Sequence, residues 1–303
     1  PIPRYEVGIA VVSKTWRKAP TLWTMLALLL ALEPTALLLP TPMSGRRAVG
    51  ASSSPSRSSR VTALDRRQAV TSAAAAAAAA TLGVSTAAIA DGKPKVVVFG
   101  GSGYVGAYAS RLLLGKGAQV VSVSRKTPAE QADKVKAILG APLAGVEYVQ
   151  LDASTGDLSG VLGGAAAVIS CIGIAPGGAN MRDGNGLVNV KIAAASKLAA
   201  VPKFVYLGLA SELASSPIKF VFGDYVKGKA EAEAAVGKDY PSALVLKPGI
   251  IAGGPPGEVR PPGPPGMAPV AVEDVARAAV AGALGNAAGT VDGNTAIAAA
   301  AAK

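Results

Sequence analysis

The chain has 303 residues, of which 50% are apolar and 16% are charged, so it can bury the core of one or two domains. Its net charge of +11 is concentrated in the first 90 residues, and the nearly balanced remainder argues against nucleic acid as a partner. The absence of histidine excludes His-based acid–base catalysis, and a single cysteine, Cys171, excludes an intramolecular disulfide.

The first 90 residues have the composition of targeting signals rather than of a domain. Residues 21–40 (TLWTMLALLLALEPTALLLP) are apolar but interrupted by Glu33 and Pro34. A membrane span needs about 20 apolar residues, so this stretch is better interpreted as a signal-peptide core. Residues 44–67 are rich in serine and arginine and have no acidic residue before Asp65, which is typical of an organellar transit segment.

A third signal follows directly. Arg66 and Arg67 precede a weakly hydrophobic region, residues 69–90, that ends in the small residues of Ala88-Ile89-Ala90. This layout resembles a twin-arginine translocation signal. Three signals in series resemble import into a thylakoid lumen, so we expect a plastid location, in the lumen or on a lumen-facing membrane, with the mitochondrion as the second choice.

Two alternatives remain for this region. The alanine run at residues 73–80 would form a helix readily, and such a helix could simply anchor or decorate the domain. Because the first residue is proline, we also expect Met25 as an alternative start, in which case the residues before it are not native.

Glycines dominate the next segment, KVVVFGGSGYVGAYASRLLLGKGAQVVSVSRK. It predicts a strand at residues 95–99, a turn, a helix at residues 104–114 and a second strand at residues 118–124. The turn matches both G-x-x-G-x-x-G and G-x-G-x-x-G. Such glycines let the backbone approach a pyrophosphate, while free N–H groups at the helix start attract it. We therefore predict a dinucleotide loop made of Gly100, Gly101, Ser102, Gly103, Tyr104, Val105 and Gly106.

The end of the second strand indicates which dinucleotide binds. An NAD-preferring fold usually has Asp or Glu there, to accept hydrogen bonds from the ribose 2′-hydroxyl. This chain has Ser124, Arg125 and Lys126, whose cations suit a 2′-phosphate. We expect NADP(H) rather than NAD(H); the alternative is that Arg125 and Lys126 only solvate a loop.

Strands and helices continue to alternate along the chain. A third strand in VEYVQLDAST leads to Asp152, a position where such folds address the adenine, and further strands lie in AAAVISCIGIA, PKFVYLGLA and SALVLKPG. Helical stretches separate them, which predicts an α/β domain with a doubly wound parallel sheet, a Rossmann fold, over residues 91–303. We interpret Cys171 as a small apolar residue near a strand end and GNTAIAAAAAK as a low-complexity tail. No acidic metal cluster is evident.

Several stretches resemble the short-chain dehydrogenase/reductase superfamily in its atypical or extended branch. The nearest resemblance is to plastid NAD(P)-binding proteins related to the nucleotide-binding accessory subunit of respiratory complex I and to a ubiquinone-biosynthesis-associated relative. The resemblance covers most of residues 95–284 and is carried by VVVFGGSGYVG, VVSVSRK, VPKFVYLGLA, DYVKGKAEAE, ALVLKPGIIAGG and PPGMAPVAVEDVARAAV.

The resemblance implies a catalytic pair, Tyr225 and Lys229, which would share one face of a helix. In the family the phenol acts as acid or base, and the lysine lowers its pKa and holds the nicotinamide ribose. A phenol that titrates near 10 needs such a cation to act at neutral pH. The LKPG that follows extends the cofactor site to Pro248.

One departure from the family pattern affects the predicted activity. The family's serine or threonine at the end of the fifth strand is replaced by Gly208, and Ser211 follows three residues later. Either Ser211 substitutes, or this donor to the substrate oxygen is missing, which can cost about a hundredfold or more in rate. Asn189 matches a family position near the active site, although a capping or packing role explains it as well.

Two functions follow from these predictions. The first is an NADP(H)-dependent oxidoreductase or epimerase that acts on a small carbonyl or on a quinone or isoprenoid-type substrate. The second is a non-catalytic, NADP(H)-bound structural or assembly subunit of a thylakoid or electron-transfer complex, with peripheral membrane association. The substrate walls would follow the fourth, fifth and sixth strands, since ligands bind at the carboxyl ends of parallel strands.

Overall fold

The structure is a computed structural model that describes residues 92–176, 178–254 and 267–302. The predicted targeting signals, the alternative start and most of the Pro/Gly-rich stretch after the sixth strand lie outside the described residues. Within the described part of the chain, no helix is both long and apolar enough to cross a bilayer.

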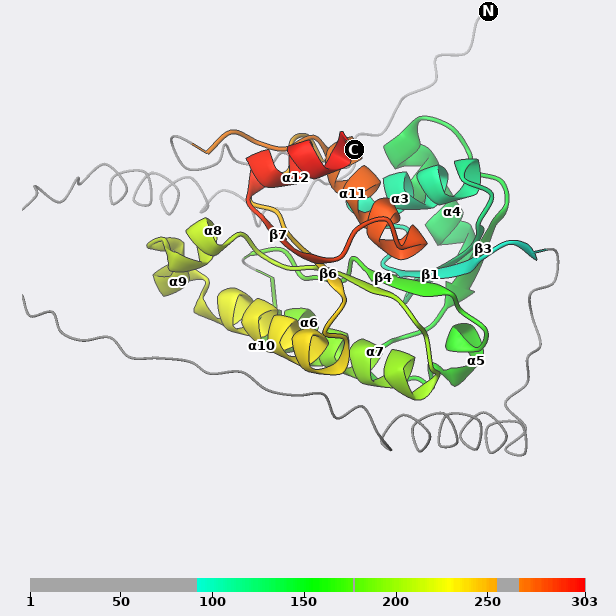
Figure 1. Cartoon of the computed structure of the whole chain (residues 1–303), viewed down its shortest axis with the longest axis horizontal. Coiled ribbons are helices and arrows are strands. Elements are labelled where there is room, and N and C mark those ends of the chain that lie inside the picture. The colour runs from blue at the N-terminus through cyan, green and yellow to red at the C-terminus, as the bar shows by residue number, and fades with distance from the viewer. Residues whose placement is uncertain (1–91, 177, 255–266, 303) are drawn as a thin grey trace, which may run out of the picture. The chain divides into compact units, whose positions relative to one another are not determined.

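A seven-stranded, fully parallel sheet forms the centre of the domain, in the order β3-β2-β1-β4-β5-β6-β7 (Figure 1). The order runs outward in both directions from the boundary between β1 and β4, as in a doubly wound sheet. The predicted fold class is confirmed. The strands are β1 (Lys95–Phe99), β2 (Gln119–Ser124), β3 (Val146–Gln150), β4 (Ala167–Ser170), β5 (Phe204–Leu207), β6 (Leu244–Lys247) and β7 (Gly289–Asp292).

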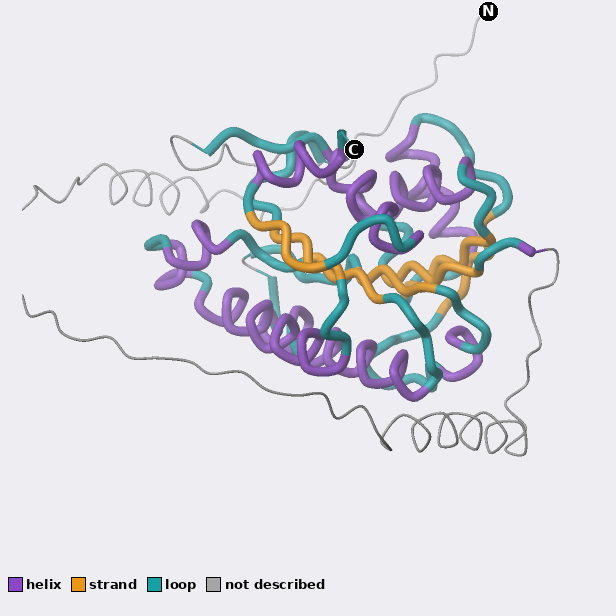
Figure 2. Tube along the Cα trace, viewed as in Figure 1, coloured by secondary structure: helices purple, strands orange, loops and turns teal. Residues whose placement is uncertain are grey.

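Helices cover both faces of the sheet (Figures 1 and 2). One layer contains α3 (Tyr104–Gly115), α4 (Pro128–Leu139), α11 (Val272–Leu284) and α12 (Asn294–Ala301). The other contains α5 (Ser159–Leu162), α6 (Met181–Asn185), α7 (Leu187–Leu198) and α10 (Gly223–Asp239). Two short helices, α8 (Ser211–Ser215) and α9 (Ile218–Val221), connect β5 to α10. The open carboxyl edge of the sheet therefore lies between two helical layers, where a ligand can enter.

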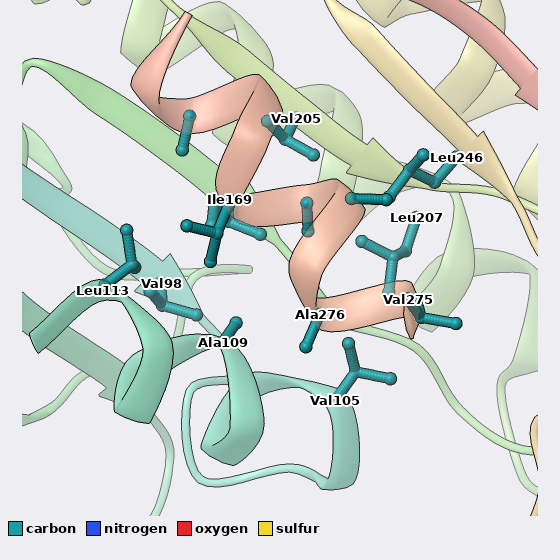
Figure 3. Close-up of a cluster of buried hydrophobic side chains, with 14 of the residues drawn as sticks. Val98, Val105, Ala109, Leu113, Ile169, Val205, Leu207, Leu246, Val275 and Ala276 are labelled. Atoms are coloured by element: carbon teal, nitrogen blue, oxygen red, sulfur yellow. The ribbon is translucent and has the colours of Figure 1, made fainter. Parts of the chain in front are cut away.

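Alternate strand residues bury on opposite faces because side chains in a strand point alternately up and down. On the α3–α11 side, Val98, Ile169 and Val205 pack beneath Ala109 and other small residues of the two helices (Figure 3). On the other side, larger groups fill the space below α7 and α10, including a stacked ring pair whose centroids lie 5.0 Å apart. Both cores support the strand ends that carry the candidate site.

The end of the chain differs from the prediction. The stretch interpreted as a low-complexity tail is helix α12, and strand β7 precedes it. Alanine has the highest helix propensity, and the helix has a packing residue as well, since Ile297 is fully buried. The low-complexity sequence at the end of the chain therefore forms a regular helix of the fold, α12.

Candidate dinucleotide and active site

The loop between β1 and α3 packs closely against the sheet because residues 100, 101 and 106 are glycines. Gly100 has φ +77°, and its N–H donates to the Val123 carbonyl at 2.9 Å. A Cβ on Gly106 would lie 2.2 Å from the Gly100 carbonyl oxygen, and one on Gly101 would lie 2.5 Å from Ser122 Oγ. Real Cβ atoms do not approach so closely, so the helix and the turn can pack this way only with glycine at these positions.

Gly103 has a different environment from the other three glycines. It precedes α3 with φ −81° and ψ 175°, a backbone conformation open to any residue, and an added Cβ would meet only the Gly100 oxygen, at 3.0 Å. No side chain caps the start of α3, and the N–H groups at the start of a helix attract anions. This bare helix start fits the pyrophosphate of a dinucleotide.

The remaining residues of the predicted loop have separate roles. The Ser102 side chain is buried, and Val105 belongs to the hydrophobic core. Tyr104 extends from the start of α3 and donates a hydrogen bond to the Ala252 carbonyl at 3.0 Å. The phosphate loop is thereby joined to the segment that follows β6, on the substrate side of the sheet.

The predicted adenosine end lies at the carboxyl ends of β2 and β3. Ser124 Oγ accepts the Lys126 N–H at 3.2 Å, Arg125 is exposed, and the Lys126 ammonium lies 3.7 Å from Glu130. Hydrogen bonds from the side chain and backbone of Ser154 hold the pKa of Asp152 below its usual value, and the positive charge of Arg125 adds to the effect. Both basic side chains thus directly follow the carboxyl end of β2.

Lys191 was not singled out from the sequence, yet it supports this end of the site. It lies on α7, and its ammonium donates to the carbonyls of Ser154, at 3.2 Å, and Gly156, at 2.9 Å. These bonds secure the turn that begins with Asp152. The sequence around a single lysine in a helix does not indicate such a contact, because the partners are backbone atoms distant in the chain.

Helix α10 holds Tyr225 and Lys229 at the opposite end of the site. Lys229 is 7% exposed, and its Nζ donates to the Leu207 carbonyl at 2.9 Å. A Cβ added to Gly173, just beyond β4, would lie 3.3 Å from this Nζ. The lysine therefore lies under the carboxyl ends of β4 and β5, where the predicted nicotinamide end of the cofactor would bind.

Burial dominates the titration of this pair. It lowers the pKa of Lys229 to about 8 and raises the pKa of Tyr225. The family resemblance implied that the lysine lowers the pKa of the tyrosine, so the direction found for Tyr225 is the opposite. The physical reason is that burial disfavours the phenolate, while Nζ is hydrogen-bonded to the Leu207 carbonyl rather than to the phenol.

Gly228, inside the Tyr225–Lys229 motif, allows α6 to approach α10. A Cβ there would lie 2.5 Å from the Arg182 carbonyl oxygen, and Arg182 pairs with Glu231 on the next turn of α10. Asn189 lies deeper: its Oδ1 accepts the Ser170 hydroxyl at 2.5 Å and its Nδ2 donates to the Asn185 carbonyl at 2.9 Å. In this structure Asn189 links β4 to α6, which is a packing role.

Ser211 is hydrogen-bonded away from the phenol of Tyr225. Its hydroxyl accepts a hydrogen bond from the Lys247 ammonium at 2.9 Å, and its N–H donates to Asp292 at 3.0 Å. Within the described part of the chain, no hydrogen bond joins Ser211 to Tyr225. Gly208 is buried and has room for a side chain, since an added Cβ would find its nearest atom, Lys247 Cγ, at 3.4 Å.

Two residues near the chain end, also missed by the sequence analysis, hold the substrate-side loops. Asn294 accepts the Gly249 N–H at 2.8 Å and donates to the carbonyls of Ile250, at 3.0 Å, and Ala268, at 2.7 Å. Asp292 accepts the N–H of Ser211. Pro248 is buried, and its carbonyl accepts the Ala210 N–H at 3.0 Å. Only the folded β7 and α12 bring these atoms together, so no sequence motif indicated them.

Cys171 follows β4 and is partly buried with a free thiol. Burial raises its pKa to about 12, so the thiol is protonated at neutral pH and is a poor nucleophile. Within the described ranges, no group of three or more acidic or cysteine side chains could hold a metal ion.

Comparisons with known proteins agree with this geometry. The family model described as NAD(P)H-binding matches residues 100–286. An uncharacterised chloroplastic protein of Arabidopsis thaliana is 36% identical over 160 residues, which is 52% of this chain and 51% of that protein. The chain thus spans about half the length of this curated relative.

Solved structures share the fold at low identity. The WbmH enzyme of Bordetella bronchiseptica, in complex with NAD+, is 18% identical with a TM-score of 0.51, over 66% of this chain and 75% of that one. A UDP-N-acetylglucosamine 4-epimerase of Methanobrevibacter ruminantium is 16% identical with a TM-score of 0.51, over 66% and 76%. At this identity the similarity concerns the fold alone.

Proposed function

We propose that this chain, which belongs to the NAD(P)H-binding family, is an NADP(H)-dependent oxidoreductase acting on a small carbonyl or on a quinone or isoprenoid-type substrate. The observation that carries the proposal is the position of Lys229. Its buried ammonium lies at the carboxyl edge of the sheet beside Gly173, on the same helix face as Tyr225. A buried cation on the same helix face as a phenol, at the sheet edge that also carries the phosphate loop, suits proton transfer coupled to a dinucleotide.

The residues present fit a dinucleotide. The glycines leave a cradle at the start of α3 that a side chain at Gly103 would fill, and basic residues follow β2. Gly100 to Gly106 would hold the pyrophosphate, Asp152 would address the adenine, and Arg125 with Lys126 would bind the 2′-phosphate of NADP(H). The reduced cofactor supplies the hydride.

The protein's own residues would manage the proton. Burial keeps Tyr225 protonated at neutral pH, so its phenol can donate to the carbonyl oxygen as the carbon receives the hydride. The carbonyl becomes an alcohol, and the phenolate left behind is stabilised by the Lys229 ammonium until a solvent proton replaces the one donated. The pKa of Lys229, about 8, is close to working pH, which suits passage of that proton.

Turnover of the full chain tests this proposal. NADPH oxidation is followed by absorbance with a set of aldehydes and quinones. Tyr225→Phe removes the proton donor, so kcat should fall by about a hundredfold or more while NADPH affinity stays within twofold. Lys227→Met, an exposed change on the same helix, serves as the matched control and should leave both unchanged. Equal turnover of Tyr225→Phe and the parent would contradict the assigned role.

The choice of NADP(H) has its own test. Arg125→Asp replaces a cation near the expected 2′-phosphate with the acidic residue that favours a free 2′-hydroxyl. We expect the ratio of NADPH to NADH affinity to fall by at least tenfold, measured by cofactor fluorescence. Lys116→Asp, an exposed charge reversal beyond α3, is the control. An unchanged ratio would remove the assignment of Arg125.

One observation favours the second function, that of a non-catalytic subunit. The Ser211 hydroxyl accepts a hydrogen bond from Lys247, and position 208 has no side chain, so among the described residues neither predicted position supplies a hydroxyl that is hydrogen-bonded to Tyr225. This arrangement suits a non-catalytic subunit in which NADP(H) stabilises the fold. Tight NADPH binding without turnover of any carbonyl in the set would favour it.

The proposed location is the plastid, with the lumen or a lumen-facing membrane as the specific site. The chloroplastic relative in Arabidopsis thaliana supports the plastid. The finer placement and the peripheral association with a thylakoid or electron-transfer assembly rest on the three predicted signals in the first 90 residues. Import of the full chain into isolated plastids, followed by fractionation, tests them; recovery in the stroma alone would contradict the lumenal placement.

A further inference from the structure

A hollow of about 510 Å³ lies between one flank of α10 and the strands β6 and β7. Val226, Ala230 and Ala234 line it from the helix, and Val245 and Thr290 line it from the sheet. This volume is within the range of small-molecule sites, roughly 300–1,000 Å³, which are mostly apolar with a few polar groups. Of the residues assigned to the dinucleotide and the active site, Lys229 alone lines it.

Small side chains on α10 create the space. Ala230, Ala234 and Gly237 follow one another at spacings of four and three residues, so they lie on one flank of the helix. A leucine or phenylalanine at any of them would occupy part of the hollow. The hollow therefore exists because the residues on this flank of α10 have small side chains or none.

The charged groups around the hollow balance one another. Lys247, whose side chain is 12% exposed, lies 3.0 Å from Glu233 and 3.6 Å from Asp292. Lys229 contributes a second cation at the end nearest the active site. Two cations with two carboxylates leave no net charge for a ligand to neutralise, and a charged ligand would bury an unpaired group. The hollow favours an uncharged, apolar occupant.

The hollow and the candidate active site share one residue, Lys229, and Val226 follows Tyr225 directly in the chain. From Val226 the wall extends to Gly237, eleven residues further, or about 16 Å along the helix axis. A molecule whose carbonyl lies at Tyr225 could therefore extend a chain along α10.

We infer that this hollow binds the hydrocarbon tail of the substrate, so that the substrate is a carbonyl compound with an uncharged, linear hydrocarbon chain. The inference rests on the proposed function. It assigns the tail to Val226, Ala230, Ala234 and Val245, with the reacting carbonyl next to Tyr225.

Binding of a neutral fluorescent probe, N-phenyl-1-naphthylamine, to the full chain tests the site without turnover. Ala234→Phe fills the hollow from an exposed helix position, so probe affinity should fall by at least tenfold, and Ala230→Phe should act likewise. Ala194→Phe, the same change at an exposed position of α7, is the matched control and should bind as the parent does. All variants should keep their NADPH affinity, which also shows that they fold.

A series of aldehydes of increasing length then tests the role in catalysis. In the parent, kcat/KM should rise by up to about fourfold per added methylene, the factor expected for burying that group. The rise should flatten in Ala234→Phe and persist in Ala194→Phe. If the parent protein did not bind NADPH, that result would contradict the proposed function itself.

Two results would overturn the tail site while NADPH still binds. One is unchanged probe affinity in both Ala234→Phe and Ala230→Phe. The other is conversion of an oligomer to a monomer by Ala234→Phe with probe binding intact, measured by sedimentation, which would identify the hollow as an interface between copies of the chain.

Discussion

Gly103 and Gly106 serve different purposes in one loop. A Cβ on Gly106 would collide with the Gly100 carbonyl at 2.2 Å, so this glycine is required by the fold itself. The space around Gly103 is open except for one contact at 3.0 Å. The distinction separates folding from ligand binding, although both glycines belong to the same sequence motif.

We therefore expect Gly103→Val to keep the fold and to weaken NADPH binding by at least tenfold, because the branched side chain enters the space of the pyrophosphate. Gly106→Ala should instead lower the free energy of unfolding by at least about 2 kcal/mol, since buried backbone must move. Urea unfolding and NADPH titration of both variants measure the two effects. Unchanged NADPH affinity in a folded Gly103→Val would refute the loop assignment.

Lys229 makes stability depend on pH. Burial lowers its pKa to about 8 in the folded chain from an ordinary value of 10.5. Between these values the unfolded chain binds more protons than the folded one, so stability rises with pH through this window. Below pH 8 the folded state bears the full cost of the buried ammonium, on the order of 3 kcal/mol.

Lys229→Met removes that cost. The stability advantage of Lys229→Met over the parent should be greatest at about pH 7 and should shrink by about 3 kcal/mol on raising the pH to about 10.5. Urea unfolding at both pH values measures it. Lys227→Met, at an exposed position of the same helix, should show no such change. A constant difference between Lys229→Met and the parent would contradict the lowered pKa.

At the scale of elements, the C-terminal unit β7–α12 lies entirely outside the stretch matched by the family model, yet it holds the substrate side together. Asn294 bonds to backbone at the two ends of the segment after β6. The bridge between Ile251 and Val270 joins the same two ends, which together form a stem. Removing the carboxamide would leave several backbone groups unpaired.

Asn294→Ala should accordingly loosen this stem without affecting the phosphate loop. We expect amide hydrogen exchange at Ala252 and Val270, whose N–H groups bond across the stem, to rise by at least tenfold. NADPH affinity should stay within twofold. Asn286→Ala, which lies beyond α11, is the control. Equal protection in Asn294→Ala and the parent would show that the carboxamide does not hold the stem.

The sequence predicted the elements that carry strong local patterns. Continuous β-branched runs marked β1 and β2, and glycine spacing marked the turn to α3, since these patterns depend on neighbouring residues alone. It did not predict β7, whose four residues Gly289–Asp292 include a glycine and an aspartate and lie at the sheet edge. Such a strand forms because it pairs with β6. This pairing depends on the tertiary structure and is not visible in the local sequence.

The same distinction applies to the site. The candidate phosphate loop could be proposed from the sequence because a dinucleotide loop requires consecutive residues in a fixed order. Lys191, Asp292 and Asn294 were not, because each bonds to backbone far away in the chain. The hydrogen-bond partners of Ser211 likewise depend on how α8 meets β6 and β7 rather than on the sequence near Gly208.

At the scale of the whole molecule, the parallel sheet brings three distant segments to one edge. The phosphate loop follows β1, the basic residues follow β2, and Lys229 reaches the end of β5 from α10. Dinucleotide binding needs all three at once, because the cofactor spans the sheet from adenine to nicotinamide. This common edge is the central claim of the account.

Fluorescence titration of the full chain with NADPH and with NADH, compared with Gly103→Val, tests that claim most directly. We predict saturable binding of one NADPH per chain, at least tenfold tighter than NADH, and loss of at least tenfold in affinity in the variant. The absence of saturable binding of either dinucleotide to a folded parent chain would contradict the account.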